Sequence, residues 1–177
     1  MLVYYSKEIY ERGLTWARRS CAAIKKLPLS KTTDLPALQN EIAMMRTSAH
    51  PNVVEYMESF MFDRCLWVAM EFMDAGSLTN LLQVYQAKRL ELSEAQMAYF
   101  LKAALEAVAF LHQLGRLHRD IKSDNLLINT HGRVKMADFG FCVQLTQEKD
   151  MRQSMVSDAD CMLLVLLQSA GSWLVFL

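Results

Sequence analysis

Two polar motifs at a fixed spacing constrain this chain more than any other feature of its 177 residues. The first motif, residues 118–125, reads HRDIKSDN, and the second, residues 138–140, reads DFG and begins eighteen positions after Asp120. Asp and Asn are also common turn formers, so either motif alone has an ordinary explanation. Carboxylates can accept protons, and carboxylate and amide oxygens can bind divalent metal ions, so these residue types are candidates for such chemistry. Asp120, Asn125 and Asp138 are the candidate residues.

A tight hairpin is predicted between the two motifs. Two short apolar or alternating runs, 126–129 and 133–136, flank Thr130-His131-Gly132, and Gly132 is free to take a positive φ angle. A rigid hairpin fixes the separation of the segments that it joins, and sites built on such elements are held better than sites on free loops. The pattern therefore predicts a preorganised site.

The first motif resembles the catalytic loop of protein kinases, and the second resembles their magnesium-binding motif. The resemblance implies that Asp120 is the catalytic base that accepts the proton of the substrate hydroxyl, and that Asn125 and Asp138 hold Mg²⁺. Lys122, two residues after Asp120, is the form of the loop that Ser/Thr kinases use. The resemblance gives it a catalytic role as a point charge on the transferred phosphate.

A second part of the site is predicted near the N-terminus. Residues 22–25, AAIK, resemble the strand whose Lys contacts the ATP phosphates. Asp34 and Pro36 are typical of a helix start. Apolar residues then recur at helical spacing, at Leu38, Ile42 and Met45. Glu41 lies beside that apolar face and sixteen residues after Lys25, in the order that matches the Lys–Glu ion pair of active kinases. Separate surface charges are the alternative.

Two strand-like runs, 54–60 and 65–71, follow this predicted helix. The second run resembles the kinase strand that enters the hinge. By that resemblance, Met70 falls at the position that gates the back pocket, and Glu71 and Met73 fall where backbone groups bind the adenine edge of ATP. Their side chains are otherwise ordinary core residues, so these assignments rest on the resemblance alone.

Two further helices are expected, one beginning at Gly76-Ser77-Leu78 and one at Ser93, where Gln96 completes a capping-box pattern. The second helix carries an apolar stripe at Met97, Leu101, Ala104, Leu105, Val108 and Leu111. It ends near Gly115, a natural C-cap. We interpret the stripe as core that supports the loop beginning three residues later.

The motif wording is most similar to the sterile-twenty-like kinases, and within them to the PAK family, over about residues 9–156. This resemblance implies an α+β, protein-kinase-like fold with the N-lobe and the first part of the C-lobe. It also implies ATP and Mg²⁺ as cofactors, a protein substrate, and regulation linked to a small GTPase through regions outside this sequence.

The chain also departs from the family pattern. Kinases place a Gly-rich loop before the strand Lys, whereas the only Gly before Lys25 is Gly13. Ser154 falls at the usual phosphorylation position, but the resemblance stops after Val156. We therefore expect a fold that is incomplete at both ends, with a partial kinase domain over residues 1–156 and an unrelated apolar tail over 157–177. The alternative to an active Ser/Thr kinase is a catalytically impaired, truncated fragment that acts as a binding or decoy module or has no function.

Composition excludes several classes of protein. Nineteen basic and nineteen acidic residues balance, which implies no nucleic-acid partner. Four scattered Cys fit reduced cytosolic thiols. The seventeen residues 161–177 are mostly apolar but are broken by polar residues and lack a flanking basic cluster, which argues against a membrane span. Residues 1–10 lack the apolar core of a signal peptide, and a cytoplasmic location is expected.

Overall fold

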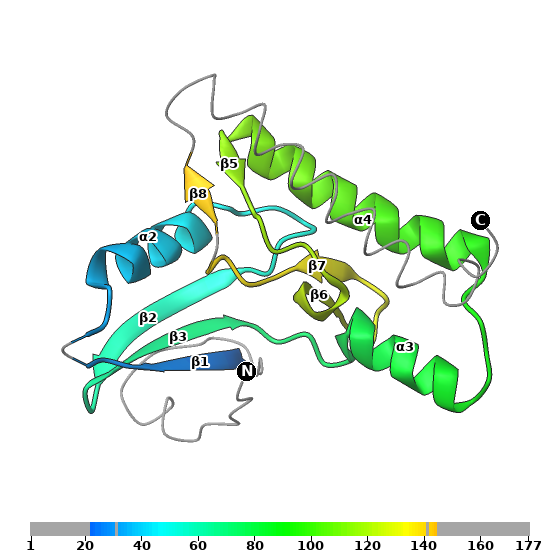
Figure 1. Ribbon diagram of the computed structural model, residues 1–177, viewed down its shortest axis with the longest axis horizontal. Coiled ribbons are helices and arrows are strands. Elements are labelled where there is room, and N and C mark those ends of the chain that lie inside the picture. Colours follow the sequence, from blue (N-terminus) through cyan, green and yellow to red (C-terminus); the bar gives the residue numbers. More distant parts are fainter. Residues whose placement is uncertain (1–21, 31, 141, 145–177) are drawn as a thin grey trace.

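The computed structural model describes residues 22–30, 32–140 and 142–144. The position of Ser154, the expected domain division at 156/157 and the apolar tail at 157–177 lie outside the described residues. The described part is of the α+β class expected from the sequence, with a three-stranded sheet on one side and two helices around smaller sheets on the other (Figure 1).

The three-stranded sheet contains β1 (Ala22–Pro28), β2 (Tyr56–Phe62) and β3 (Cys65–Glu71) in the order β1-β3-β2, with antiparallel pairing throughout. The central strand β3 pairs on both sides, and three consecutive residues in it, Val68, Ala69 and Met70, are buried. Lys25 lies opposite Val68 in the middle of β1. The strand predicted at 54–60 begins at Tyr56 instead, and its register shifts between Tyr56 and Glu58.

Helix α2 (Leu35–Arg46) lies alongside this sheet, next to β2 (Figure 1). The predicted N-cap is confirmed, because the Asp34 carboxylate accepts a hydrogen bond of 3.0 Å from the backbone N–H of Ala37. Met44 and Met45 are buried, and the predicted inner-face residues Leu38 and Ile42 are half-buried. The apolar side of α2 thereby anchors the helix and fixes the direction in which its other side chains point.

Helices α3 (Leu78–Ala87) and α4 (Glu94–Gln113) both begin with a capping box, formed by Ser77 with Asn80 and by Ser93 with Gln96. The expectation that Leu105 belongs to the buried stripe of α4 was wrong, since Leu105 is 46% exposed. A residue is rotated by roughly 100° from its neighbour in a helix, so a stripe through residues 104, 108 and 111 excludes position 105. The buried side of α4 consists of Ala103, Ala104, Ala107, Val108 and Leu111.

The described part of the chain also contains two smaller sheets, one with three strands and one with two. The predicted hairpin is confirmed: β6 (Leu126–Ile128) and β7 (Val134–Met136) pair antiparallel, and Gly132 in their turn has a φ angle of +78°. Strands β5 (Arg116–Leu117) and β8 (Val143–Gln144) form a short pair near the C-terminal end of α4 (Figure 1). The remaining short elements are β4 (Gly76–Ser77), which pairs with β6, and the 3-10 turn η1 (Ser123–Asn125).

One buried apolar cluster joins these parts into a continuous core. It contains side chains from α2, from the sheet, from α4 and from the hairpin, including Met45, Val68, Val108 and Met136. Because the hairpin and the sheet share this core, the segment that follows β7 is held at a fixed place relative to β1. Within the described ranges, none of the helices combines the length and the apolar character that a membrane crossing requires.

Candidate active site

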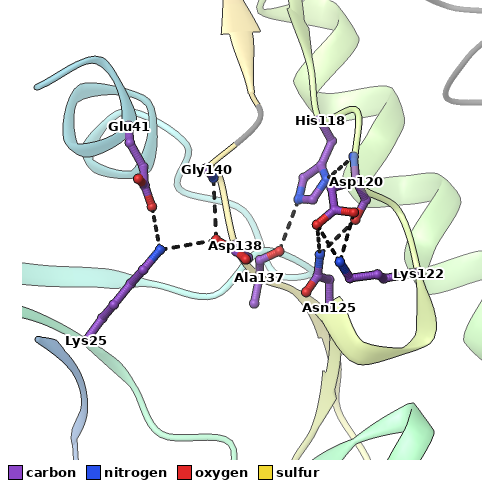
Figure 2. Close-up of polar contacts among 9 residues, drawn as sticks. All are labelled: Lys25, Glu41, His118, Asp120, Lys122, Asn125, Ala137, Asp138 and Gly140. Carbon is purple, nitrogen blue, oxygen red and sulfur yellow. Dashed lines mark hydrogen bonds and ion pairs between the residues drawn. The ribbon is translucent and has the colours of Figure 1, made fainter. Parts of the chain in front are cut away.

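Lys25 of β1 lies between two carboxylates that come from distant parts of the chain (Figure 2). Its Nζ atom is 2.7 Å from Oε1 of Glu41 on α2 and 3.2 Å from Oδ1 of Asp138. The expected Lys25–Glu41 pairing is thus present. Burial lowers the pKa of Lys25, but the hydrogen bond to Glu41 and the charges of Asp138 and Glu41 outweigh burial, and the net effect raises this pKa. We call Lys25, Glu41 and Asp138 the lysine end of the site.

Asp138 follows β7 in a left-handed backbone conformation, with a φ angle of +67°. Asp tolerates this region better than most side chains, although the conformation still costs free energy. Phe139 is buried, and its ring centroid lies 5.6 Å from that of His118. The Asp138 carboxylate is 43% exposed. In this motif, the buried Phe139 anchors the segment while the neighbouring Asp138 carboxylate stays accessible. This arrangement directs the charge of Asp138 toward Lys25.

His118 joins the two motifs from inside the core. Its ring is fully buried, its Nδ1 atom accepts a hydrogen bond of 3.3 Å from the Asp120 backbone N–H, and its Nε2 atom lies 3.0 Å from the Ala137 carbonyl oxygen (Figure 2). A ring nitrogen that accepts from an N–H must carry a lone pair, so Nε2 carries the proton and donates to Ala137. The loop after β5 and the residue before Asp138 are therefore hydrogen-bonded through one side chain.

Asp120, Lys122 and Asn125 form the second part of the site, which we call the loop end. Lys122 Nζ lies 3.0 and 2.8 Å from the two Asp120 carboxylate oxygens. Asn125 donates through Nδ2 to the Asp120 carbonyl at 2.8 Å and to its carboxylate at 2.9 Å. Burial raises the pKa of Asp120, but the hydrogen bonds from Lys122 and Asn125 and the charge of Lys122 outweigh it and lower this pKa. Asp120 is consequently an oriented carboxylate at neutral pH.

A cleft of about 640 Å³ connects the two ends with the strand-to-helix link after β3. Its volume lies in the range of pockets that hold small-molecule ligands. The hinge candidates Met70, Glu71 and Met73 line this cleft, together with the whole lysine end and Asn125 of the loop end. The Glu71 carboxylate is bound to Lys135 of β7 at 2.5 Å, so the hinge side of the cleft is tied to the strand that leads to Asp138.

Asn125 and Asp138 have the donor chemistry that Mg²⁺ prefers. Both Asn125 amide hydrogens face Asp120 oxygens, which leaves the amide oxygen Oδ1 as the atom available to a metal ion. In the part of the chain that the structure describes, no cluster of three His, Cys, Asp or Glu side chains is suited to hold a metal ion. Mg²⁺ is commonly held by one or two protein oxygens together with substrate phosphates and water, and the pair fits that mode.

Several residues of the site were not identified from the sequence. Arg119 has a φ angle of +62°, and Lys135 is a buried cation paired with Glu71. Asp74 holds the hairpin turn by accepting two hydrogen bonds from Thr130. The alternation of residues 133–136 was a usable signal for Lys135, because it places residues 134 and 136 on one face and Lys135 on the other. No sequence pattern signals the backbone angle of Arg119.

The sequence of this chain is similar to sequences of known proteins. The model of the protein kinase domain matches residues 11–160. The chain is 47% identical over 135 residues to serine/threonine-protein kinase pakC of Dictyostelium discoideum, which covers 76% of this chain and 28% of pakC. It is 43% identical over 134 residues to serine/threonine-protein kinase PAK mbt of Drosophila melanogaster, with 76% of this chain and 20% of that relative covered.

The chain spans less than a third of the length of these curated relatives. The matched region nevertheless contains both ends of the site, the cleft and the whole described fold. The resemblance drawn from the motifs and the kinase-like fold are both confirmed by the match. This chain belongs to the protein kinase family, and it is similar to the PAK-type serine/threonine kinases within it.

Proposed function

We propose that this protein transfers the γ-phosphoryl group of ATP to a Ser or Thr hydroxyl of a protein substrate. The observation that carries the proposal is the convergence of Lys25, Asp138 and Asn125 on one cleft, with the oriented carboxylate of Asp120 beside them. Phosphoryl transfer depends on positioning and charge stabilisation more than on covalent chemistry by the protein. A cleft with one cation at the lysine end and an ionised carboxylate at the loop end meets both needs.

The lysine end supports nucleotide binding. Lys25 keeps its positive charge because its pKa is raised, and Glu41 holds the ammonium in place for the ATP phosphates. Asn125 and Asp138 are the residues that would hold Mg²⁺, which supplies positive charge to neutralise the phosphates. We assign the back of the cleft to Met70 and the adenine edge to the backbone of Glu71 and Met73, which line it.

The loop end supports activation of the substrate hydroxyl. Asp120 accepts the hydroxyl proton as the hydroxyl oxygen attacks, and its orientation is fixed by Asn125 and Lys122. Lys122 is 45% exposed, so its ammonium can also reach the transferred phosphate. Lys at this position is the Ser/Thr form of the loop, which is why we propose Ser and Thr rather than Tyr as acceptors. A cytoplasmic location and regulation linked to a small GTPase are part of the same proposal.

Asp120→Asn tests the function, because it removes the base while leaving the nucleotide side of the cleft intact. We expect turnover of Mg-ATP with a basic Ser/Thr peptide to fall by about 10² to 10⁴-fold. Nucleotide affinity, measured with a fluorescent ATP analogue, should change less than about threefold, since the base acts in the transition state rather than in the ground state.

Asp63→Asn is the matched control. Asp63 lies in the turn between β2 and β3 and does not line the cleft, so the same Asp-to-Asn change is made away from the site. We expect this variant to match the unsubstituted protein. If the unsubstituted protein binds nucleotide but transfers no phosphate, the catalytic proposal fails and the alternative of a binding or decoy module is supported. Transfer that persists in Asp120→Asn also contradicts the assignment.

A further inference from the structure

The side chain of Arg116 in β5 donates hydrogen bonds to two segments that are distant from it in the sequence. The proposed reaction gives these bonds no role. Its Nη1 atom donates to Ser48 Oγ at 2.7 Å and to the Met44 carbonyl at 3.4 Å, and its Nη2 atom donates to Thr47 Oγ1 at 2.7 Å. Its Nε atom donates to the Gln144 side-chain oxygen at 3.1 Å. A single guanidinium group therefore contacts both the C-terminal end of α2 and strand β8.

The acceptors of Arg116 are themselves held in place. Ser48 is fully buried. Thr47 caps α2, with its hydroxyl donating to the Ala43 carbonyl at 2.6 Å. Gln144 donates through Nε2 to the carbonyl oxygens of Leu114 and Gly115 at 2.9 and 3.2 Å. A solvated surface arginine would not have its nitrogen donors directed at three anchored partners, so the contacts describe a bridge and not a chance encounter.

Of the two segments that Arg116 joins, one carries Glu41 and the other closely follows Asp138, two of the three lysine-end residues. Thr47 caps the helix that presents Glu41, and β8 follows shortly after Asp138-Phe139-Gly140. Arg116 itself directly precedes Leu117 and His118, and it pairs with Gln144 across the β5–β8 ladder. A rotation of α2 that separates Glu41 from Lys25, or a displacement of β8 that moves Asp138, must break bonds to the same guanidinium.

We infer that Arg116 is a positioning residue that couples the placement of α2 to the placement of the segment after Asp138. It contacts neither Lys25 nor the cleft, and it acts through the elements that carry Glu41 and Asp138. Its effect on phosphate transfer rests on the proposed function, but the mechanical coupling between α2 and β8 does not. The planar fork of Arg is required, because an ammonium group cannot span a helix end and a strand at once.

Amide hydrogen exchange resolved by NMR on the full chain tests the coupling without using activity. In Arg116→Met, we expect exchange to accelerate about five- to tenfold both at the C-terminal turn of α2 and at Val143 and Gln144. Thr47→Val removes one acceptor of Arg116 and the cap bond to Ala43 at the end of α2, but it leaves Arg116 and β8 unsubstituted, and we expect faster exchange in β8 as well. Adding Thr47→Val to Arg116→Met should leave β8 exchange at the level of Arg116→Met alone.

Arg116→Lys keeps the charge and loses the fork, and we expect it to behave like Arg116→Met. Arg133→Met is the control, because Arg133 is an exposed arginine in the hairpin turn. A Thr47→Val effect confined to α2, or normal exchange in Arg116→Lys, would overturn the inference.

Phosphate transfer is measured on the same variants as a second readout. We expect Arg116→Met and Arg116→Lys to lower turnover about tenfold, because small misplacements of distant supports reduce rates strongly. If the exchange results show the coupling but the protein transfers no phosphate, the proposed function is refuted and the coupling between α2 and β8 stands. If Arg116→Met and Arg116→Lys transfer phosphate normally and exchange in α2 and β8 is not coupled, the positioning role of Arg116 is refuted and the proposed function stands.

Discussion

Lys25 reaches its two carboxylate partners across 16 and 113 residues of sequence, whereas Asp120 is held by side chains two and five residues further along the chain. The loop end can thus form from the conformation of one short segment. The lysine end exists only when the sheet, α2 and the hairpin have packed together. Substitutions in the core should therefore disturb the lysine end before the loop end.

The lysine end and the loop end should also differ in how much they contribute to stability and to the reaction rate. Glu41 is 13% exposed and Lys25 is 29% exposed, so removing one charge of this partly shielded pair leaves the other without its partner and destabilises the fold. Lys122 is 45% exposed, and exposed ion pairs contribute little to stability. We expect lysine-end variants to change both the unfolding equilibrium and the reaction rate, and loop-end variants to change mainly the rate.

Among the lysine-end variants, Asp138→Asn should produce the largest effect, because it removes the accessible carboxylate of that end. Asn tolerates the left-handed backbone at this position, so the substitution changes charge more than conformation. We expect turnover to fall about 10³-fold and the dependence of nucleotide binding on Mg²⁺ concentration to weaken. Steady-state rates and nucleotide titrations at several Mg²⁺ concentrations measure both. A loss below about tenfold would contradict the metal assignment.

Glu41→Gln removes the carboxylate through which α2 pairs with Lys25, and it should lower both stability and turnover. We expect turnover to fall about 10- to 100-fold and the free energy of unfolding to fall by about 1 kcal/mol. Chemical denaturation and steady-state kinetics measure the two losses. Glu106→Gln is the control, because it breaks an exposed i,i+4 pair with Lys102 in α4. If the two variants lose equal stability, the lysine end is not a shielded pair.

Lys122→Met tests the loop end in the same way. We expect turnover to fall about tenfold, because the transferred phosphate loses a point charge. The denaturation midpoint should stay unchanged, because the Lys122 side chain is exposed. A shift of this midpoint comparable with that of Glu41→Gln would remove the contrast between the two ends.

The smallest effect is a change in acid stability. The hydrogen bonds and charge around Asp120 lower its pKa below the ordinary value of 3.8. A carboxyl with a lowered folded pKa contributes stability above its ordinary pKa, and this contribution is lost as the pH falls through the folded pKa. The denaturation midpoint should therefore drop less between about pH 6 and about pH 3 in Asp120→Asn than in the unsubstituted protein. An identical drop in both would mean that the folded environment does not lower this pKa.

Features encoded by local patterns were predicted well. The hairpin with Gly132, the N-cap at Asp34 and the capping box at Ser93 depend on residues a few positions apart, and all three are present. The pairing of Lys25 with Glu41 was predicted from the family pattern, since spacing alone leaves two solvated charges as an alternative. The roles assigned to the site residues remain predictions.

Features that depend on tertiary packing were missed. The exposure of Leu105 depends on which side of α4 meets the hairpin, and the apolar pattern tolerated a one-residue rotation. The buried ring of His118 and the four contacts of Arg116 join segments whose proximity no local pattern indicates. Left-handed angles at Arg119 and Asp138 are imposed by their surroundings, because their residue types do not demand them.

The contact between Lys25 and Asp138 also has a consequence for the order of folding. Closing a loop of 113 residues rather than one of 16 costs about 1.7 kcal/mol more in chain entropy. The loop end and the hairpin can therefore assemble first, while β1 joins late. If the chain folds in this order, Asp120 and Asn125 reach nearly native positions before Lys25 does. Binding of nucleotide phosphates should then begin only at the last step of folding.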